Sequence, residues 1–446
     1  MEKPVQISRS ALSALKKSGY SAFLVGGSVR DRLMGRPVHD IDIATNALPQ
    51  ETARVFEKYA VIPTGLAHGT VTVLIENTPV EITTFRTESA YSDNRHPDFV
   101  SFSKNLSDDL SRRDFTMNAI AEDENGALFD PFGGKEDIEK KLIRCVGNAE
   151  TRFKEDALRI LRALRFSAVL SFSIEEETSR AIRSCKTLLN KLSPERIASE
   201  LSLLLCSDGA ADVLLRYPEV FAEIIPCLKA MQGFDQHNEH HCFDVWEHTV
   251  NVVRNVRPAL HLRLAALFHD CAKPLVFSLD ESGTGHFYSH APRGAAIAEK
   301  ELKRLRFDNE TTQKVVKLVK IHDSPIECDE VTVKKKLNRL GEETFFDLTR
   351  LQRADNLAQS EKFRFRQKNF DYLEETAKKI LEQNECFSLK KLAVNGYDML
   401  SLGLCGKEIG AMLDFLVEQV IEGKTANEKP LLLEAAKREK EKRKKP

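Results

Sequence analysis

Two aspartates separated by a single residue, Asp40 and Asp42, lie in the segment "HDIDIAT". Residues i and i+2 of a β-strand point to the same face, so we expect the two carboxylates to project side by side. Negative charges that close repel one another unless cations lie between them, and Mg²⁺ prefers such oxygen ligands. The pair predicts a two-metal centre that activates an attacking hydroxyl and stabilises a leaving pyrophosphate. A solvated acidic strand end is the alternative.

A third carboxylate would complete this centre. Glu81 in "PVEITTF" lies on another predicted strand and is the natural candidate, with a surface charge as the alternative. We therefore assign Asp40, Asp42 and Glu81 to the catalytic centre, and the two aspartates to Mg²⁺ binding.

A phosphate-binding turn is predicted upstream, in "FLVGGSVRD". Its two glycines allow the backbone to approach a ligand, and the helix that follows presents unpaired N–H groups and a favourable dipole to phosphates. Arg30 lies on the first turn of that helix, where its guanidinium would bind phosphate oxygens. We assign Gly27 and Arg30 to triphosphate binding; a tight strand-to-helix turn without a ligand is the alternative.

The elements that must position these residues are short strands within the first 145 positions. Segments rich in Val, Ile, Thr and Phe, bounded by Gly, Pro or Asn, predict strands at 23–27, 40–44, 70–76 and 79–85. A helix should begin at Ser28 and end at Gly35. From about residue 150 onward the strand signals largely disappear and apolar residues recur at helical spacing. The sequence therefore predicts an α+β fold, with a small sheet in the head and an all-α body.

The arrangement "LVGGSVRD…DIDIAT" resembles the catalytic head of the class II nucleotidyltransferases, within the DNA polymerase β superfamily. More narrowly, it resembles the bacterial CCA-adding enzymes, which rebuild the 3′ end of transfer RNA. The matching motifs extend from residue 20 to about 170, with weaker similarity to the C-terminus. The resemblance implies Mg²⁺-dependent, template-independent addition of CCA from CTP and ATP.

A second group of candidate residues lies in "EDALRILRALRF". Asp156, Arg159, Arg162 and Arg165 recur every three residues on an otherwise apolar helix, so that neighbours are about 60° apart and within contact distance. Arginines that wind around an apolar helix are hard to explain as a solvated face. Structural salt bridges to the head are the alternative.

Hydrogen-bond chemistry gives this group a role in choosing the base. Adenine and cytosine both present an amine donor beside a ring-nitrogen acceptor, whereas guanine and uracil present the reverse. A carboxylate only accepts and a guanidinium only donates, so a rigid Asp–Arg pair fits A or C. Each mismatch with G or U leaves buried groups unpaired, at a cost of about 1–3 kcal/mol.

In the resembling family the matching motif has this role, which we carry over to Asp156 and Arg159. Arg162, Arg165 and Arg113 in "RRDFT" are then expected to contact the base or the triphosphate. The polar segment 86–111 is typical of a functional loop. In the family a flexible loop here accompanies the switch from adding C to adding A, so its presence favours addition of CCA or of A alone. A simple surface excursion is the alternative.

Histidines and aspartates interrupt the apolar helical segments of the second half of the chain. Imidazole and carboxylate ligands gathered from several helices suit a divalent transition metal or Mg²⁺. The pair His269-Asp270 resembles the signature of the HD phosphohydrolase superfamily. Four residues match the ligand series of that superfamily, and two match the extra histidines of its two-metal members: His248, His269, Asp270 and Asp355, then His290 and His322.

The resemblance implies phosphatase, 2′-nucleotidase or cyclic phosphodiesterase activity for this second site. The segment 226–238, which ends in "MQGFDQHN", reads as a joint inside the helical body. The two resemblances together imply four segments. These are a nucleotidyltransferase head, a nucleotide-selecting and RNA-binding neck, an HD domain and a helical tRNA-binding tail: 1–145, 146–232, 233–360 and 361–446.

The composition fits a cytoplasmic, globular chain with no membrane span. Of its 446 residues, 42% are hydrophobic and 30% charged, no apolar run reaches the length of a membrane span, and the nine cysteines form no CxxC pair. The net charge is only −1, but the tail 437–446 is strongly basic. It predicts an arm that contacts RNA phosphates, with a solvated helix as the alternative.

We therefore expect the partners to be ATP, CTP and the acceptor arm and 3′ end of transfer RNA, with the chain a monomer or homodimer. Alternatives remain: an enzyme adding only the terminal A, a poly(A) polymerase, an HD phosphohydrolase with a regulatory head, and a noncatalytic RNA-binding protein.

Overall fold

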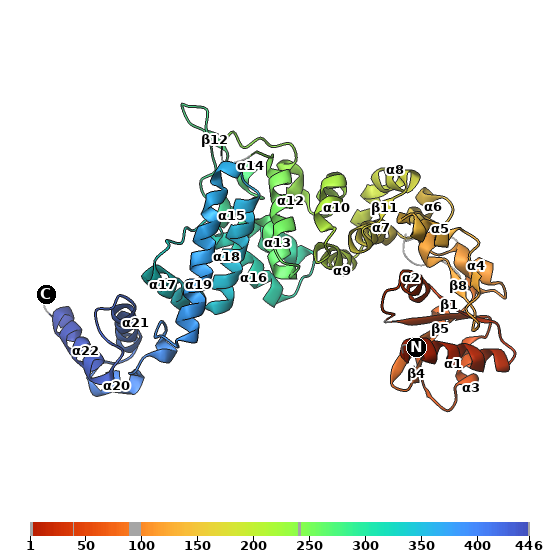
Figure 1. The fold of residues 1–446 in the computed structure, drawn as a ribbon, viewed down its shortest axis with the longest axis horizontal. Helices are drawn as coiled ribbons and strands as arrows, with labels where there is room; N and C mark the ends of the chain where they lie inside the picture. The colour runs from red at the N-terminus through yellow and green to blue at the C-terminus, as the bar shows by residue number, and fades with distance from the viewer. Residues whose placement is uncertain (1–2, 39, 89–99, 240–241, 445–446) are drawn as a thin grey trace. The chain divides into compact units, whose positions relative to one another are not determined.

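The computed structural model describes residues 3–38, 40–88, 100–239 and 242–444, in two compact units, Met1–Lys229 and Ala230–Pro446 (Figure 1). The division falls inside the joint predicted at 226–238. The finer boundaries predicted at residues 145 and 360 each fall inside one of these two units.

A seven-stranded sheet forms the centre of the first unit. All neighbouring strands are antiparallel except the parallel pair β2–β5. In β5, the buried Val80, Ile82 and Thr84 alternate with the outward-facing Glu81 and Thr83, which is the period of two expected of a strand with one buried face. The strands in spatial order are β3 (Ala60–Gly65), β4 (Thr70–Ile75), β5 (Thr78–Thr84), β2 (Ile41–Thr45), β1 (Ala22–Val25), β8 (Ala121–Glu122) and β9 (Leu128–Phe129).

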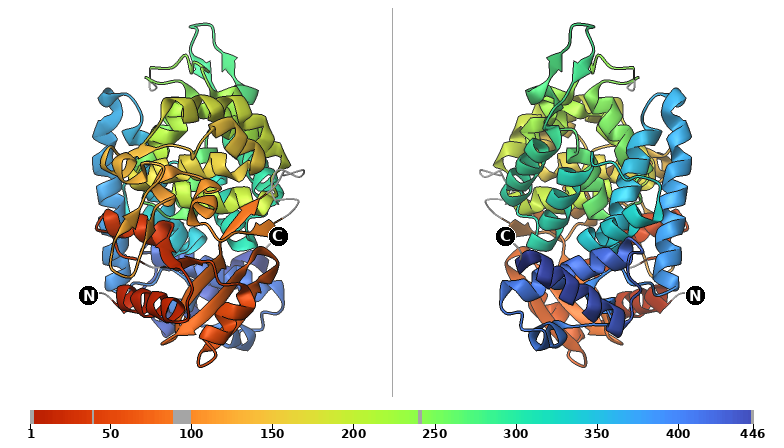
Figure 2. Two further views of the ribbon diagram at one scale, coloured as in Figure 1. Left: turned by 90° about the vertical axis from the view of Figure 1, so that its right-hand side faces the viewer. Right: turned by 90° about the vertical axis from the view of Figure 1, so that its left-hand side faces the viewer.

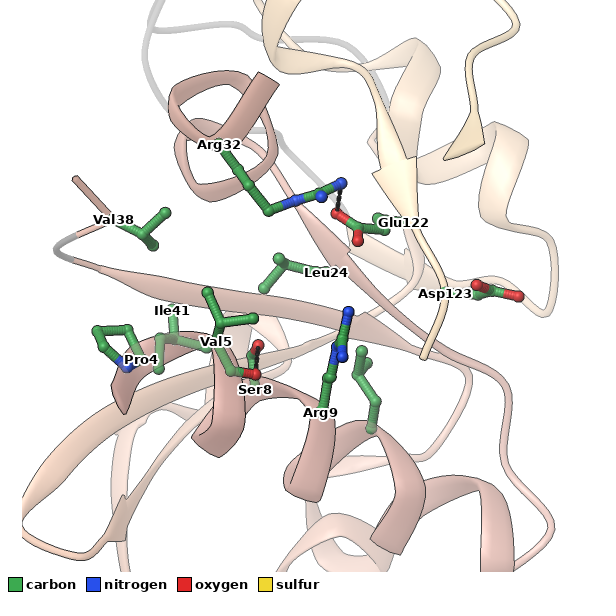
Figure 3. A pocket seen from close by; sticks show the side chains of 11 residues that line it. Pro4, Val5, Ser8, Arg9, Leu24, Arg32, Val38, Ile41, Glu122 and Asp123 are labelled. Carbon is green, nitrogen blue, oxygen red and sulfur yellow. Dashed lines mark hydrogen bonds and ion pairs between the residues drawn. The ribbon is translucent and has the colours of Figure 1, made fainter. Parts of the chain in front are cut away.

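Helices α1 (Lys3–Lys17) and α3 (Pro49–Val55) cover one face of this sheet, and α2 (Gly27–Leu33) lies toward the other (Figure 1). Figure 3 shows a pocket between α1 and the sheet, lined by apolar side chains such as Leu24 and Ile41 and crossed by an ion pair between Arg32 and Glu122. Packing on this side leaves the opposite face of β2 and β5 available for Asp42 and Glu81.

The predicted loop 86–111 has regular structure at both ends. Strands β6 (Arg86–Glu88) and β7 (Val100–Phe102) pair antiparallel, and helix α4 (Leu106–Ser111) follows. Residues 89–99 of this loop lie outside the described residues. The two ends of this predicted functional loop therefore have regular structure, in which backbone hydrogen bonds satisfy the N–H and C=O groups.

The rest of the first unit is mostly helical and packs around α7, with α9 and α10 against it. Its remaining elements are η1 (Leu66–His68), η2 (Thr116–Asn118), α5 (Gly134–Glu139), β10 (Leu142–Ile143), α6 (Ala149–Glu155), α7 (Leu158–Leu170), β11 (Ser173–Ile174), α8 (Glu176–Cys185), η3 (Lys186–Lys191), α9 (Pro194–Leu205), α10 (Ala210–Arg216), α11 (Pro218–Ile224) and η4 (Pro226–Met231).

The second unit is a helical bundle with a separate C-terminal cluster. The β12–β13 hairpin projects from the bundle, and α20, α21 and α22 form a cluster with its own core (Figure 2). Its elements are α12 (Val245–Asn255), α13 (Leu260–Phe268), α14 (Lys273–Val276), β12 (Ser278–Leu279), β13 (Gly285–His286), α15 (His290–Arg304), α16 (Asn309–Ile321), α17 (Glu330–Leu340), α18 (Glu342–Leu357), η5 (Glu361–Arg366), α19 (Gln367–Glu382), η6 (Leu389–Lys391), α20 (Gly396–Ser401), α21 (Lys407–Ile421) and α22 (Lys429–Lys444).

Among the described residues, no helix combines the length and the apolar composition needed to cross a bilayer. The basic tail 437–446 continues α22 as far as Lys444, and Lys445 lies outside the described residues. Part of its charge is already paired, since Arg438 and Arg443 form ion pairs with glutamates one turn earlier on the same helix.

Candidate functional site

The three predicted carboxylates lie at neighbouring positions of the sheet. Asp42 is in β2 and faces Glu81 of β5 in the parallel register, while Asp40 immediately precedes β2. Burial raises the pKa of Asp42 to about 6. The negative charges of Glu81 and Asp40 contribute to this raised pKa, whereas the Arg113 guanidinium opposes it. Partly buried negative charge in excess of its positive partners is the condition that a divalent cation relieves, so these residues fit Mg²⁺.

The first glycine of the predicted turn, rather than the second, is the constrained one. Gly26 has φ +72°, and a Cβ atom there would lie 3.1 Å from Nη1 of Arg113 and 3.5 Å from Oδ2 of Asp42. Gly27 is the first residue of α2, and a Cβ there would meet only Nη2 of Arg30, at an ordinary 3.5 Å. Gly26 therefore lets the backbone pass close to the carboxylates.

A serine that the sequence analysis missed connects this turn to the aspartates. The Ser28 hydroxyl donates to the backbone carbonyl of Asp40 at 2.9 Å and accepts from the backbone N–H of Asp42 at 3.3 Å. It fixes α2 against the start of β2, and so sets the spacing between the glycine turn and the carboxylates. Only the tertiary arrangement identifies it, because Ser28 looks like any residue of a helical first turn.

Arg30 is buried and directed toward the neck helix α7. Its Nη1 donates to Oδ1 of Asn118 at 2.8 Å, its Nε donates to Oδ1 of Asp31 at 2.9 Å, and its guanidinium lies 5.0 Å from the centroid of the Phe166 ring. Asn118 in turn donates to Oδ1 of Asp114 at 3.0 Å. Arg30 thus belongs to a hydrogen-bonded network that links the head to the neck.

Arg113 lies beside the carboxylates, as the proximity of Gly26 and Asp42 shows. Its Nη2 donates to Oδ2 of the fully buried Asp109 at 3.1 Å. Although burial alone would raise the pKa of Asp109, the adjacent Arg113 and Arg112 hold it below its usual value. The ion pair with Asp109 therefore fixes the orientation of the Arg113 guanidinium, which faces Asp42.

The structure does not pair Asp156 with Arg159. Oδ2 of Asp156 accepts from Nη2 of Arg196 at 2.8 Å and Oδ1 accepts from the backbone N–H of Leu158 at 3.0 Å, whereas Nη1 of Arg159 donates to Oε2 of Glu155 at 2.6 Å. The expected pair is wrong because Asp156 ends α6 with extended backbone (φ −138°, ψ 106°) and does not share a helical surface with Arg159.

The two remaining arginines of this series are held by carboxylates. Nε and Nη2 of Arg162 both reach Oδ2 of Asp114, at 2.8 and 2.7 Å, and Nε of Arg165 pairs with Glu200 at 2.5 Å. The guanidinium groups of both arginines lie over the Phe166 ring, at 5.3 and 4.0 Å from its centroid. The alternative of salt bridges to the head thus describes Arg162, while Arg165 is bound within the neck.

The second unit brings all six predicted metal-binding residues together. In each of the four histidines Nδ1 lies 2.7–3.4 Å from a backbone carbonyl, which can only accept, so Nδ1 carries a proton and Nε2 is directed at the cluster. The pairs are His248 with Ala358, His269 with Ala266, His290 with Phe287, and His322 with Val319.

Asp270 lies at the centre of this cluster. Its Oδ2 is 3.7 Å from Nε2 of His248 and 3.2 Å from Nε2 of His269, and its Oδ1 is 3.6 Å from Nε2 of His290 and 3.8 Å from Nε2 of His322. The cluster therefore contains two sets of three ligand atoms, each set within 4.8 Å of one another, that share Asp270. A carboxylate shared by two such sets can bridge two neighbouring cations.

Asp355 closes one side of the cluster, with Oδ1 2.8 Å from Nε2 of His248 and 3.7 Å from Nε2 of His269. Burial alone would lower the pKa of His269, but the Asp270 and Asp355 carboxylates raise it to about 10. Nε2 of His269 is buried and makes no hydrogen bond of acceptable geometry. An orphaned ring nitrogen that faces two carboxylates fits a divalent cation.

Two residues near the cluster escaped the sequence analysis. Nζ of Lys273 lies 2.8 Å from Oδ2 of Asp270 and also donates to Oε1 of Gln236 at 2.8 Å. Lys273 follows Asp270 by three residues, which is one helical turn, so the spacing carried a usable signal. Gln236 carried none, since it comes from a distant segment.

Comparison with known proteins agrees with this architecture. Residues 22–144 match the family described as the poly A polymerase head domain, and residues 171–231 match the probable RNA and SrmB-binding site of polymerase A. Residues 291–436 match the putative tRNA nucleotidyltransferase domain 2.

Curated relatives carry the name CCA-adding enzyme. The protein from Geobacillus thermodenitrificans is 50% identical over 214 residues, which cover 48% of this chain and 52% of that protein. The protein from Lactobacillus johnsonii is 56% identical over 189 residues, which cover 42% and 47% of the two chains. The matched region thus spans about half the length of these relatives.

A solved structure matches the whole chain. The crystal structure of the Bacillus stearothermophilus CCA-adding enzyme in complex with CTP has a TM-score of 0.76 and 30% identity, and the match covers 100% of both chains. The predicted fold class, a polymerase-β-like head followed by a helical body, is thereby confirmed. The chain belongs to the family of the CCA-adding enzymes.

Proposed function

We propose that this chain adds CCA to the 3′ end of transfer RNA, using CTP and ATP and no nucleic-acid template. The 3′-hydroxyl oxygen attacks the α-phosphorus of the nucleotide, the bond to the β-phosphate oxygen breaks, and pyrophosphate leaves. The observation that carries this proposal is the register that places Asp42 opposite Glu81, with Asp40 immediately before the strand and the Gly26 turn directly beside Asp42. Its family membership supports the same reaction.

The residues of the first unit divide the work of this reaction. Mg²⁺ held by Asp40 and Asp42 would supply the positive charge that favours deprotonation of the hydroxyl and stabilises the pyrophosphate. Gly26 and Gly27 open the turn to the triphosphate, and Arg113 faces the same site. Asp156 and Arg159 select the base as two separately held groups, Asp156 by Arg196 and Arg159 by Glu155.

Transfer RNA is bound by its shape and phosphates, because the deep groove of A-form RNA offers side chains little sequence to read. The basic tail supplies part of the required charge. We place the protein in the cytoplasm, where its substrate is made; none of its nine cysteines is joined in a disulfide, which is consistent with a reducing compartment.

Incorporation of labelled nucleotides into transfer RNAs that end before C, before CC or before CCA tests the proposal. CTP alone should add two residues, and ATP should then add one. Failure to incorporate C at all would instead identify an enzyme that adds only A, and long A tracts would identify a poly(A) polymerase. If Asp42→Ala leaves nucleotide addition intact, the proposed centre is wrong.

We infer a second activity, metal-dependent hydrolysis of phosphate esters, from the convergence of four Nε2 atoms and two carboxylates in the second unit. A divalent cation held there would supply the charge that activates an attacking water. Water adds to the phosphorus, the ester P–O bond breaks, and the released alkoxide takes a proton to become a hydroxyl. Hydrolysis of 2′,3′-cyclic phosphates and phosphomonoesters with Mg²⁺, Mn²⁺ or Ni²⁺ tests this, and His269→Ala should abolish it while nucleotide addition continues.

A further inference from the structure

A cavity of about 420 Å³ opens beside the histidine–aspartate cluster of the second unit. Two members of the cluster, His322 and Asp355, form part of its wall, so a molecule in the cavity touches the ligand set directly. The volume is within the range of small-ligand sites, about 300–1,000 Å³. The rest of the wall includes a second carboxyl group, that of Asp323, besides Gln352, Asn356, Gln359, Arg366, Asn369 and Phe370.

Arg366 is the cation of this wall. It is exposed, and within the part of the chain that the structure describes it has no carboxylate partner; its guanidinium lies 5.4 Å from the centroid of the Phe363 ring. The preceding cations of the same segment differ, because Lys362 pairs with Glu239 and Arg364 with Glu361. An arginine that keeps its charge available at the mouth of a cavity is suited to bind phosphate oxygens.

Phe370 and Asn369 add the features that a nucleobase requires. Phe370 is half-buried and gives the cavity an aromatic wall; the Arg353 guanidinium lies 5.8 Å from the centroid of its ring, so a base can stack only on the ring surface that Arg353 leaves uncovered. The side-chain amide of Asn369 is exposed, with one donor group and one acceptor for a base edge. Gln352 is already committed as a donor to the carbonyls of His322 and Ser324, which fixes that side of the wall.

The segment that carries Arg366 continues as an exposed strip of cations and aromatic rings. Phe365 is 67% exposed, although a phenylalanine normally avoids water. Lys368 follows it, also exposed and without an ion pair among the described residues. Cations interleaved with exposed rings are typical of surfaces that bind single-stranded nucleic acid through phosphates and stacked bases.

We propose that this cavity binds the 3′-terminal nucleotide of a single-stranded RNA end that carries a terminal phosphate. Phe370 stacks on the terminal base, Arg366 binds the phosphate, and Phe365 stacks on the preceding base. The phosphate then lies next to the cluster, where the ester bond is hydrolysed. This assignment rests on the hydrolytic activity proposed for the cluster, and it names the substrate class of that site.

The test compares an RNA oligonucleotide ending in a 3′-phosphate with p-nitrophenyl phosphate, which has no base and no neighbouring nucleotide. The phosphorylated RNA also lacks the free hydroxyl that the head extends. Arg366→Ala and Phe365→Ala should each raise KM for the RNA about tenfold or more, with KM for p-nitrophenyl phosphate changed far less by Phe365→Ala. Arg366→Lys should restore part of the affinity, and Arg339→Ala, an exposed arginine of α17 outside the cavity, serves as the matched control.

A second readout needs no bound metal. RNA with a photoreactive thiouridine as its phosphorylated last nucleotide should crosslink, in the presence of EDTA, to a peptide within 352–373, and Arg366→Ala should reduce that crosslink. Crosslinks confined to the first unit, or an unchanged KM for RNA in both variants, would overturn the proposal. If the wild type hydrolyses neither substrate with any metal yet still crosslinks at 352–373, the hydrolytic function fails and the RNA-end site stands.

Discussion

Arg162 of the neck is bound to Asp114 of the head through two N–H groups that reach the same carboxylate oxygen, at 2.8 and 2.7 Å. The other oxygen of Asp114 accepts from Asn118, which also accepts from Arg30 on the helix that follows the glycine turn. One carboxylate therefore couples the orientation of α7 to the turn beside Asp40 and Asp42, the proposed catalytic aspartates. A substitution at Asp114 should therefore change the position of both α7 and the glycine turn.

Asp114→Asn should lower stability at neutral pH. Although burial alone would raise the pKa of Asp114, the Arg162 guanidinium and the Asn118 amide lower it from its ordinary value of 3.8 to about 2. A carboxyl with a depressed folded-state pKa contributes stability above pH 3.8, and this contribution is lost as the pH falls toward 2. The shift corresponds to about 2 kcal/mol.

Calorimetry of the wild type and the variant from pH 7 to pH 3 measures this difference. The unfolding transition of the first unit should occur several degrees lower in Asp114→Asn at pH 7, and the gap should narrow as the pH falls. If the difference in unfolding temperature between the two proteins stays constant across this pH range, the loss of stability does not come from the ionisation of Asp114. Asp212→Asn, a change to an acid of α10, provides a control for the substitution itself.

Asp42→Asn should have the opposite effect. Burial and the neighbouring carboxylates raise the pKa of Asp42 to about 6, so its ionised form is disfavoured in the folded protein. The folded state is destabilised increasingly as the pH rises from about 4 through 6, and the variant removes a cost of up to about 3 kcal/mol at pH 7.5. In metal-free buffer the variant should therefore unfold at a higher temperature than the wild type while adding no nucleotides.

Added MgCl₂ supplies the discriminating measurement. It should raise the melting temperature of the wild type and leave that of Asp42→Asn nearly unchanged, because binding to the folded state alone stabilises it. Glu57→Gln, at an exposed acid outside the cluster, should behave as the wild type does. A wild type that Mg²⁺ does not stabilise would contradict a cation site at these carboxylates.

Arg196 should act in base selection through Asp156, although it has no place in the predicted motif. Its Nη2 holds Oδ2 of Asp156 at 2.8 Å, so Arg196→Ala leaves that carboxylate free to turn away. We expect discrimination of CTP and ATP against UTP and GTP to fall about tenfold or more, as in Asp156→Ala, because the rejected bases then leave fewer buried groups unpaired. Single-turnover incorporation with each nucleotide measures this ratio, with Arg180→Ala of the neck surface as the control. Unchanged selectivity in Arg196→Ala would show that Asp156 needs no such support.

The strands could be predicted from the local sequence because the alternation of buried and outward-facing residues is visible in each short segment. The four predicted strands agree with β1, β2, β4 and β5 to within two residues at each end. Strand β3 was missed, since its segment "AVIPTG" contains a proline and reads as irregular. The very short β8 and β9 exist only because they pair at the edge of a sheet that the local sequence does not specify.

The site residues also fall into those that the local sequence reveals and those that depend on tertiary packing. The histidines of the proposed metal site could be grouped from the sequence because each is a short polar interruption of an apolar helix, and the fold brings these interruptions together. The partners of the arginines could not be identified, because Glu200 lies 35 residues from Arg165 and Asp114 lies 48 residues from Arg162. Which carboxylate neutralises which guanidinium is decided by how α7, α9 and the head pack.

The shared position of Asp270 predicts how metal content responds to substitution. Because both sets of ligand atoms include this carboxylate, Asp270→Asn should lose every divalent ion bound by the second unit, whereas His290→Ala should lose one of two. Elemental analysis after loading with Mn²⁺ or Ni²⁺ and dialysis measures the stoichiometry. Asp42→Asn should lose only the ions of the proposed centre in the first unit, so the metal content of the second-unit variants is compared in an Asp42→Asn background. An Asp270→Asn protein with wild-type metal content would disprove the shared site.

The two glycines of the turn should respond differently to alanine. At Gly26 the backbone has φ +72°, which alanine adopts only with strain, and the new Cβ would lie 3.1 Å from Nη1 of Arg113. Arg113 must then shift away from Asp42, so we expect kcat for nucleotide addition to fall by about a hundredfold, as small displacements at reacting centres commonly do. At Gly27 the residue is already helical and its new Cβ meets only the end of the Arg30 side chain, at 3.5 Å.

Gly27→Ala should therefore keep most of its activity, and any loss should appear in KM for the nucleotide, because only a close approach of the triphosphate would be hindered. Steady-state kinetics with CTP on transfer RNA that ends before C separates the two effects. Gly35→Ala, where φ is +67° but no atom lies within 4 Å of the new Cβ, controls for backbone strain alone. If Gly35→Ala impairs kcat as much as Gly26→Ala does, strain explains the loss; a selective effect at Gly26 assigns it to the contact with Arg113.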